Sequence, residues 1–264
     1  MCGIFGFLLK EPVEMAEVFK VLQKLERHQY QGERTPVGGF GAGVAVLSCS
    51  GEVLLDKVGK VYGSPVDHLS KVCEVRRACV LIGHVRMPSP KPEFMETAHF
   101  RENAQPYVAR CFSGCCVVSA HNGYMANYEL VRRRLGGRHV FESERKGVLI
   151  DSEVIPHFFE ELLVEEEDYN RALERLFLKM EGSNTVSLLQ TGDGCLFLHI
   201  VHKGRTRGLH VWKNWDGEVV FCSRKEPLNE CFSHVLSRRG FKEYVSIPCG
   251  MEGYYKETFI FDLR

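Results

Sequence analysis

The sequence carries no excess of charge of either sign, because 34 Lys and Arg residues balance 34 Asp and Glu residues. A balanced chain lacks the attraction to nucleic acid or anionic membranes that strongly basic proteins have. It has no apolar run of the ~20 residues that a membrane-spanning helix needs, and its start lacks the basic stretch and cleavage site of a signal peptide. We therefore expect a cytoplasmic protein with no nucleic-acid or membrane partner.

The eleven cysteines include no CxxC pair. The densest group, Cys111 with Cys115 and Cys116, does not have zinc-finger spacing, and no carboxylate lies at a ligand-like spacing from the strand-end residues His84 and His121. The sequence therefore predicts no metal and no cofactor. A chain of 264 residues buries a large core without disulfides, so most cysteines are expected to be reduced and buried.

Hydrophobic periodicity predicts strands and helices in a mixed order. The predicted elements are a strand at 3–9, a helix at 13–27, a hairpin at 43–59 turning at Ser50-Gly51, strands at 79–85 and 115–121, helices at 152–163 and 168–181, and C-terminal hairpins. The helices are too few for a βαβ repeat. A layered α/β sandwich of mainly antiparallel sheets fits best, and no repeat or linker divides residues 1–264, which predicts one domain.

Cys2 follows the initiator methionine, and its small size permits removal of Met1. Cys2 would then carry a free α-amine, whose ordinary pKa of ~7.7–8.0 suits a general base near neutral pH. Nucleophile and base would lie in one residue. From MCGIFGF alone, however, a cysteine in a buried strand is the better interpretation.

Three other positions carry groups suited to acyl transfer. Asn122-Gly123 offers two donors for an oxyanion, although Asn-Gly is also a hairpin turn signal; the residues that follow predict a helix instead. Arg86 ends an apolar strand, where its planar guanidinium suits a carboxylate. Asp151 precedes a helix and, taken alone, is best read as an N-cap. Together, Arg86 and Asp151 would complement the carboxylate and ammonium of a free amino acid.

Five motifs in order resemble the glutaminase domain of class II glutamine amidotransferases, the N-terminal-nucleophile group. They are MCGIFGF, GHVRMPSP (83–90), ENAQPY (102–107), HNGYMANY (121–128) and DSEVI (151–155). Weaker similarities extend it: DKVGKVYG (56–63) resembles the strand end after the first hairpin, SRKEPL (223–228) a late loop and IPCGM (247–251) the closing turn, so the resemblance spans nearly the whole chain. It implies a four-layer αββα sandwich and glutamine as substrate.

The resemblance also implies roles for the candidate residues. Cys2 would be the nucleophile that forms a γ-glutamyl thioester, with its own α-amine as general base, and Asn122 and Gly123 would form the oxyanion hole. Arg86 would bind the glutamine carboxylate. Asp151 would bind the ammonium, which Gly123 would help to hold.

Two segments depart from the family pattern. After Arg86 the family usually continues with an aromatic residue, whereas this chain reads Met87-Pro88-Ser89-Pro90. Ser89 falls where relatives often have a threonine near the substrate. The 28–40 segment replaces the family's Arg-Gly-x-Asp stretch, so neither Arg27 nor Arg34 is equated with the family arginine.

Three functions fit these residues. The leading hypothesis is a stand-alone glutaminase subunit that hydrolyses glutamine and delivers ammonia to a separate synthase subunit, because the chain ends where the glutaminase domain ends. The alternative is a γ-glutamyl amide hydrolase with water as the only acceptor. A third is a non-catalytic glutamine-binding module, if Met1 is retained. The sequence leaves the acceptor and the oligomeric state open.

Overall fold

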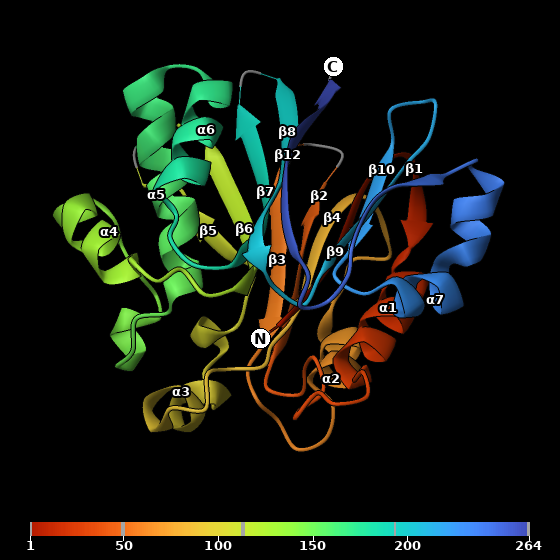
Figure 1. The fold of residues 1–264 in the computed structure, drawn as a ribbon, viewed down its shortest axis with the longest axis horizontal. Coiled ribbons are helices and arrows are strands. Elements are labelled where there is room, and N and C mark those ends of the chain that lie inside the picture. Colours follow the sequence, from red (N-terminus) through yellow and green to blue (C-terminus); the bar gives the residue numbers. More distant parts are fainter. Residues whose placement is uncertain (1, 49–50, 112–113, 193, 263–264) are drawn as a thin grey trace.

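Two antiparallel sheets lie face to face between two layers of helices in the computed structural model, which describes residues 2–48, 51–111, 114–192 and 194–262 (Figure 1). In spatial order, the first sheet has β11 (Lys242–Ile247), β9 (Leu209–Lys213), β10 (Val219–Cys222), β1 (Gly3–Glu14), β4 (Arg77–Val85), β2 (Ala42–Leu47) and β3 (Val53–Val58). The second has β12 (Glu252–Asp262), β8 (Cys195–Arg205), β7 (Asn184–Gly192), β6 (Cys116–Gly123) and β5 (Tyr107–Ala109). This confirms the αββα sandwich.

Each sheet has its own set of helices on its outer face (Figure 1). Those beside the first sheet are α1 (Met15–Arg27), α2 (Pro65–Val72) and α7 (Lys225–Arg238), and those beside the second are α4 (Tyr128–Leu135), α5 (Asp151–Glu166) and α6 (Tyr169–Lys179). The short helix α3 (Pro92–Glu96) lies at one end of the sheets. Single 3₁₀ turns occur at η1 (Thr97–His99), η2 (Arg101–Asn103), η3 (Gly136–Arg138) and η4 (Glu144–Lys146).

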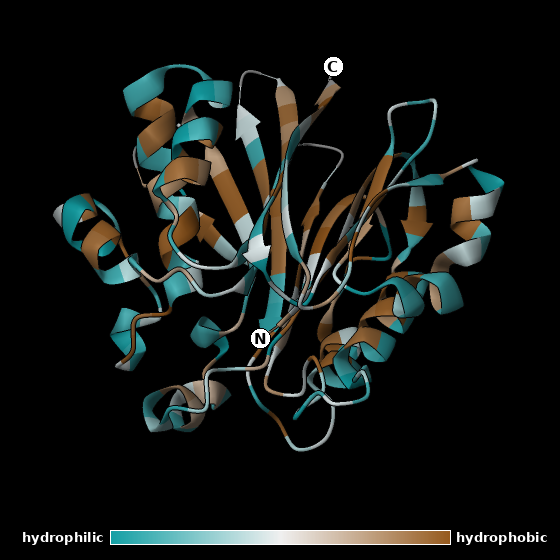
Figure 2. Cartoon of the chain, viewed as in Figure 1, coloured by the Kyte–Doolittle hydropathy of each residue, from teal (hydrophilic) through white to brown (hydrophobic). Residues whose placement is uncertain are grey.

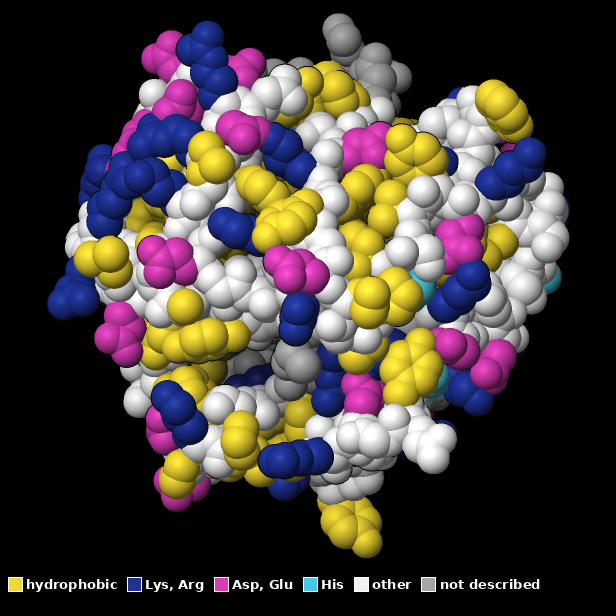
Figure 3. All heavy atoms as spheres, viewed as in Figure 1, with side chains coloured by type: hydrophobic (Ala, Val, Ile, Leu, Met, Phe, Trp, Pro, Cys, Tyr) yellow, Lys and Arg dark blue, Asp and Glu magenta, His cyan; other side chains and the backbone are white. Residues whose placement is uncertain are grey.

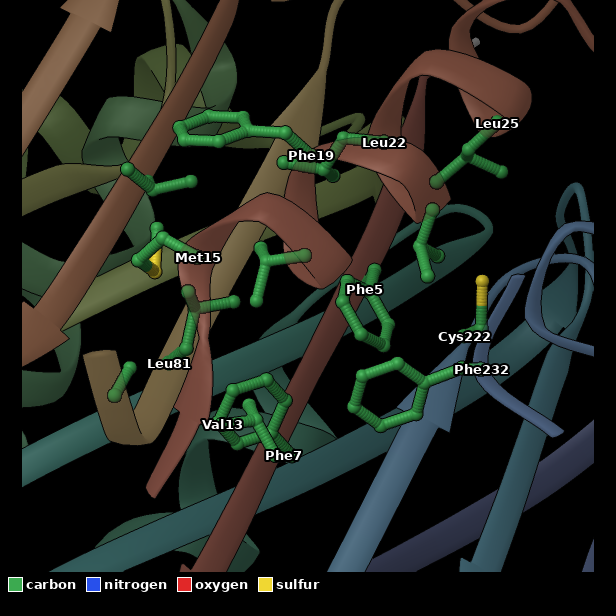
Figure 4. Close-up of a cluster of buried hydrophobic side chains, with 14 of the residues drawn as sticks. Phe5, Phe7, Val13, Met15, Phe19, Leu22, Leu25, Leu81, Cys222 and Phe232 are labelled. Atoms are coloured by element: carbon green, nitrogen blue, oxygen red, sulfur yellow. The ribbon is translucent and has the colours of Figure 1, made fainter. Parts of the chain in front are cut away.

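Strand alternation in β1 explains why a single strand contributes to two cores. Ile4 and Leu8 pack between the sheets, whereas Phe5 and Phe7 pack under α1 and α7. In the outer core, Phe232 of α7 meets Phe5 edge-on and stacks on Phe7, with ring centroids 5.6 and 6.1 Å apart (Figure 4). Truncating such a buried ring to alanine costs about 3–5 kcal/mol. The start of β1 is therefore anchored by packing on both faces.

Hydropathy follows this layering. Brown hydrophobic segments of the helices face the sheets, and teal hydrophilic segments face outward (Figure 2). Over α4, α5 and α6, basic and acidic side chains lie beside one another (Figure 3), as in the ion pairs Arg132–Glu144 and Arg134–Glu165. Among the described residues, no helix is both long and apolar enough to cross a membrane.

Most predicted elements exist, with shifted ends. The helix predicted at 13–27 begins at Met15, because β1 continues to Glu14 and pairs Val13 with Ala78. The helices predicted at 152–163 and 168–181 are α5 and α6. The hairpin at 43–59 is β2–β3, although Ser50 of its turn lies outside the described residues.

Two expectations were wrong. SRKEPL was expected in a loop, but α7 begins at Lys225 and carries Pro227 in its first turn. Proline is tolerated there because the backbone N–H groups of the first turn have no hydrogen-bond partner within the helix. The prediction that most cysteines are buried fails, since only Cys73, Cys116 and Cys222 are buried among the described cysteines, all of which are free thiols.

Candidate functional site

A pocket of about 510 Å³ is lined in part by Phe94 of α3. Figure 1 shows that α3 lies at one end of the sheets. The pocket lining joins segments that are far apart in the sequence: the start of β1, the loop after β4, the end of β6 and the start of α5. Five of the six residues predicted from the sequence line it, namely Cys2, Arg86, Ser89, Gly123 and Asp151. The volume is in the range of small-molecule sites.

Backbone pairing on both sides of β1 fixes Cys2. Gly3 pairs with Val85 of β4, so the next step of the register places Cys2 beside Arg86. On the other side, Ser223 donates its N–H to the carbonyl of Ile4 and accepts the N–H of Ile4 at its hydroxyl. The Cys2 Sγ lies 3.4 Å from the backbone nitrogen of Met87 and 3.5 Å from its carbonyl oxygen. The thiol is partly exposed to the pocket at a defined position.

Arg86 follows directly after β4, and its side chain is 4% exposed. Its backbone bonds to Phe40 and Gly41 across the strand end, which holds the residue at the pocket wall. The buried Nη1 has no hydrogen-bond partner in the described part of the chain. An unpaired buried guanidinium donor is costly unless something binds it, so Arg86 is available for an anion in the pocket.

Asn122 is the exception among the predicted residues. It is fully buried, does not line the pocket, and lies within β6 rather than after it as predicted. The even positions of β6, Val118 and Ala120, face the space between the sheets, and Asn122 continues this face. Neither its Oδ1 nor its Nδ2 has a hydrogen-bond partner among the residues described. The amide is thus an unsatisfied group that faces the space between the two sheets.

Gly123 ends β6 at the pocket with φ +154°. A Cβ at this position would meet the carbonyl oxygen of Ser183 at 2.2 Å and the Nε2 of His121 at 2.9 Å. Both the backbone angle and the crowding require glycine here, which lets a ligand approach the backbone closely. The Asn-Gly pair is therefore a strand end and not a hairpin turn.

Asp151 does not cap its own helix. The N-cap position of α5 is Ile150, and the Asp151 Oδ2 instead accepts the N–H of Met125 at 3.0 Å. Its side chain stays 19% exposed, toward the pocket. The N-cap interpretation is thus wrong, and the carboxylate is held in place by the chain that follows β6.

The buried ring of His121 supports the acidic end of the pocket. Its Nδ1 lies 2.9 Å from the Ser152 hydroxyl and 3.9 Å from the Asp151 carboxylate, and its Nε2 lies 3.0 Å from the Asn184 Oδ1. Because Asn184 Oδ1 only accepts, Nε2 carries the proton and Nδ1 accepts from Ser152. Burial lowers the pKa of His121 despite the nearby Asp151, so the ring stays neutral.

Comparison with known proteins decides the family. No protein-family model matches the chain. The glutamine–fructose-6-phosphate aminotransferase (isomerizing) of Sulfurisphaera tokodaii is 31% identical over 199 residues, which are 75% of this chain and 30% of that protein. The amidophosphoribosyltransferase of Archaeoglobus fulgidus is 38% identical over 111 residues, or 41% of this chain and 21% of that protein. The chain belongs to the class II glutamine amidotransferases.

Solved structures agree on the fold. The glutamine phosphoribosylpyrophosphate amidotransferase from B. subtilis superposes with a TM-score of 0.62 at 18% identity, covering 97% of this chain and 49% of that one. This class II amidotransferase chain spans about a third or less of the length of the two curated relatives. The shared part is therefore one portion of those longer proteins.

Two pocket residues of this class II chain were not singled out from the sequence. Gln105, in the ENAQPY motif, bonds the backbone of His121 from both ends of its amide, donating to the carbonyl at 3.1 Å and accepting the N–H at 2.7 Å. Gln105 thus fixes β6 directly before Asn122 and Gly123. Lys91 adds a second cation to the lining. The ENAQPY motif indicated the place of Gln105 but not its contacts, and nothing in the sequence indicated Lys91.

In the 28–40 segment, the charged residue that contacts buried groups is Glu33 and not an arginine. Arg27 and Arg34 are exposed and do not line the pocket. The Glu33 carboxylate pairs with the buried Arg224 and lies 3.9 Å from Nε of Arg207. Burial lowers the pKa of Arg207, and the nearby Glu33 acts in the opposite direction. The Glu33 carboxylate therefore lies against two buried arginines.

Proposed function

We propose that the chain hydrolyses the side-chain amide of glutamine through a thioester on Cys2. The observation that carries this proposal is the convergence of Cys2, Arg86 and Asp151 on one pocket with charges of both signs. An amino acid substrate would place its carboxylate at Arg86 and its ammonium at Asp151. Its side-chain amide would then extend toward the thiol.

The proposed reaction has two steps. The Cys2 thiol gives its proton to its own α-amine and attacks the amide carbon, which forms a C–S bond and places the negative charge on the oxygen. Donors from Asn122 and Gly123 would stabilise that oxyanion. The C–N bond then breaks, and ammonia leaves with the proton from the amine. Water attacks the thioester, which releases glutamate and regenerates the thiol.

The acceptor of the ammonia is part of the same proposal. The two curated relatives are named as a glutamine–fructose-6-phosphate aminotransferase and an amidophosphoribosyltransferase. Both extend well beyond the matched region. We therefore infer that ammonia passes to a synthase unit outside residues 1–264. Glutamate and ammonia release, measured with and without co-purified partner proteins, tests this. Full uncoupled hydrolysis and no associated synthase would contradict the delivery of ammonia to a partner.

Replacing Arg86 with lysine should raise the KM for glutamine about tenfold with a smaller change in kcat. Lysine keeps the positive charge but lacks the planar pair of N–H donors. Loss of one hydrogen bond to the substrate carboxylate should cost roughly 1.4 kcal/mol of binding free energy, which is about tenfold in KM. Steady-state kinetics measures this. Arg133→Lys, an exposed change on α4, is the matched control and should behave like the wild type. An unchanged KM in Arg86→Lys would contradict the role of Arg86.

A second candidate function is the hydrolysis of larger γ-glutamyl amides with water as the only acceptor. The observation that favours it is the Met87-Pro88-Ser89-Pro90 loop in the lining of a pocket larger than a single amino acid needs. A panel of γ-glutamyl peptides and amides separates the two functions. Higher kcat/KM on γ-glutamyl peptides than on glutamine favours the hydrolase, and the reverse order favours the glutaminase.

The third hypothesis, a non-catalytic glutamine-binding module, depends on Met1, which lies outside the described residues. A retained Met1 would leave the nitrogen of Cys2 in a peptide bond, where it cannot act as a base. Intact-mass measurement detects the loss of one methionine directly. A retained Met1 together with glutamine binding and no turnover would select this hypothesis.

A further inference from the structure

Four side chains with metal-ligating atoms meet beside α5, away from the pocket lining. They are Cys111 after β5, His139 after η3, and His157 and Glu160 on α5. His157 and Glu160 are three residues apart, so they share one face of the helix. The three polar side chains other than Cys111 are buried. The Cys111 thiol is partly exposed, so one side of the group is accessible.

The spacing of these atoms matches a small tetrahedral site. Ligand atoms of tetrahedral zinc lie about 2.0–2.3 Å from the ion, which puts them roughly 3.3–3.6 Å from one another. Here the His139 Nδ1 lies 3.2 Å from the His157 Nδ1 and 3.6 Å from the Glu160 Oε2. The Cys111 Sγ lies 3.4 Å from the His157 Nδ1. All four ligand atoms fall within 4.8 Å of one another.

The neighbouring groups orient the ligands. The Nε2 of His139 lies 3.2 Å from the Glu161 carboxylate, so the Nε2–H donates to that carboxylate and the Nδ1 lone pair faces inward. The N–H of Cys111 donates to the Oε1 of Glu160 at 2.7 Å and holds that carboxylate against the group. A histidine that binds a metal through one ring nitrogen usually donates the N–H of its other ring nitrogen to a carboxylate in this way.

We propose that Cys111, His139, His157 and Glu160 bind one zinc ion in a closed structural site. Sulfur, two imidazoles and a carboxylate are a zinc donor set, and four protein ligands leave no open position for a reacting water. The ion would tie the chain after β5 and the chain after η3 to α5. Asp151 lies on the same helix, about 9 Å along its axis from His157. The site is separate from the proposed glutaminase reaction and does not depend on it.

Zinc content tests the site directly. The full chain, carrying Cys2→Ser because a free N-terminal cysteine chelates zinc on its own, is dialysed against zinc and then against buffer. Elemental analysis should give about one zinc per chain. A Cys111→Ser change should remove most of that zinc, whereas Cys115→Ser, in the same loop but outside the four ligands, should retain it. Equal zinc in the Cys111→Ser and unsubstituted chains would overturn the site, as would equal loss in the Cys115→Ser control.

Cobalt substitution covers the case in which Cys111→Ser fails to fold. Cobalt bound in place of zinc should show the charge-transfer absorption of a thiolate ligand and the strong visible bands of tetrahedral coordination. A folded chain that takes up no cobalt, or takes it up with only the weak bands of octahedral coordination and no thiolate absorption, would contradict the proposal. Chelator treatment should lower the Tm of the zinc-loaded chain but leave that of a folded His157→Ala chain unchanged.

Discussion

Replacing Cys2 with serine should lower kcat for glutamine hydrolysis by on the order of 10³-fold or more while the fold stays intact. The alcohol is a far weaker nucleophile than the thiol near neutral pH, and no other described cysteine lines the pocket. Serine keeps the size of the side chain and the register of β1 with β4 and Ser223, so thermal unfolding should change little. Glutamate release in a coupled assay measures the effect.

The control for this variant is Cys195→Ser. Cys195 is also partly exposed, but it begins β8 at the far end of the second sheet from Gly123. It should keep the wild-type rate. A Cys2→Ser chain that turns over glutamine within a few-fold of the wild type would remove Cys2 from the mechanism.

Replacing Asn122 with alanine should reduce kcat about 10²- to 10³-fold with little change in KM. The amide of Asn122 has no partner among the described residues and faces the space between the sheets, so no neighbouring residue already occupies its donor. Steady-state kinetics separates kcat from KM. If the amide only fills space, its removal should lower the Tm and leave kcat near the wild-type value.

Ser119→Ala is the matched control for Asn122→Ala. Ser119 is fully buried on the same strand, its hydroxyl also has no partner in the described structure, and it lies on the opposite face of β6. Its truncation should leave both kcat and KM unchanged. Equal loss of kcat in the two variants would show that β6 is merely sensitive to truncation.

The sequence predicted which residues line the pocket better than it predicted their local contacts. The family resemblance predicts that Cys2, Arg86, Gly123 and Asp151 meet, and each lies at the start or end of a strand or at the start of a helix in the pocket lining. Their local structure was harder to predict from the sequence. Asp151, taken alone, is best interpreted as an N-cap, but its carboxylate accepts the N–H of Met125, and no pattern in the sequence marks the turn that brings the two together.

The remaining misses share one physical cause, which is tertiary packing between distant segments. The family resemblance placed SRKEPL in a loop, yet α7 begins within it, because Phe232 packs on Phe5 and Phe7 and Pro227 is tolerated in the first helical turn. Only the spacing of Cys111 with its neighbouring cysteines was tested from the sequence, and the group that Cys111 forms with Glu160, which lies 49 residues further along the chain, was not considered. Sequence spacing detects sites built on one loop, but not sites built across a helix and two loops.

The most direct test of the account follows the N-terminus and the reaction in one sample. Chain whose intact mass shows the loss of Met1 is incubated with glutamine, with and without prior thiol alkylation, and glutamate release is compared with peptide mapping of the alkylated cysteines. The account predicts glutamate release that disappears in proportion to the alkylation of Cys2, and slower alkylation of Cys2 when glutamine is present. Glutamate release that persists when Cys2 is fully alkylated, or that occurs with Met1 still attached, would contradict it.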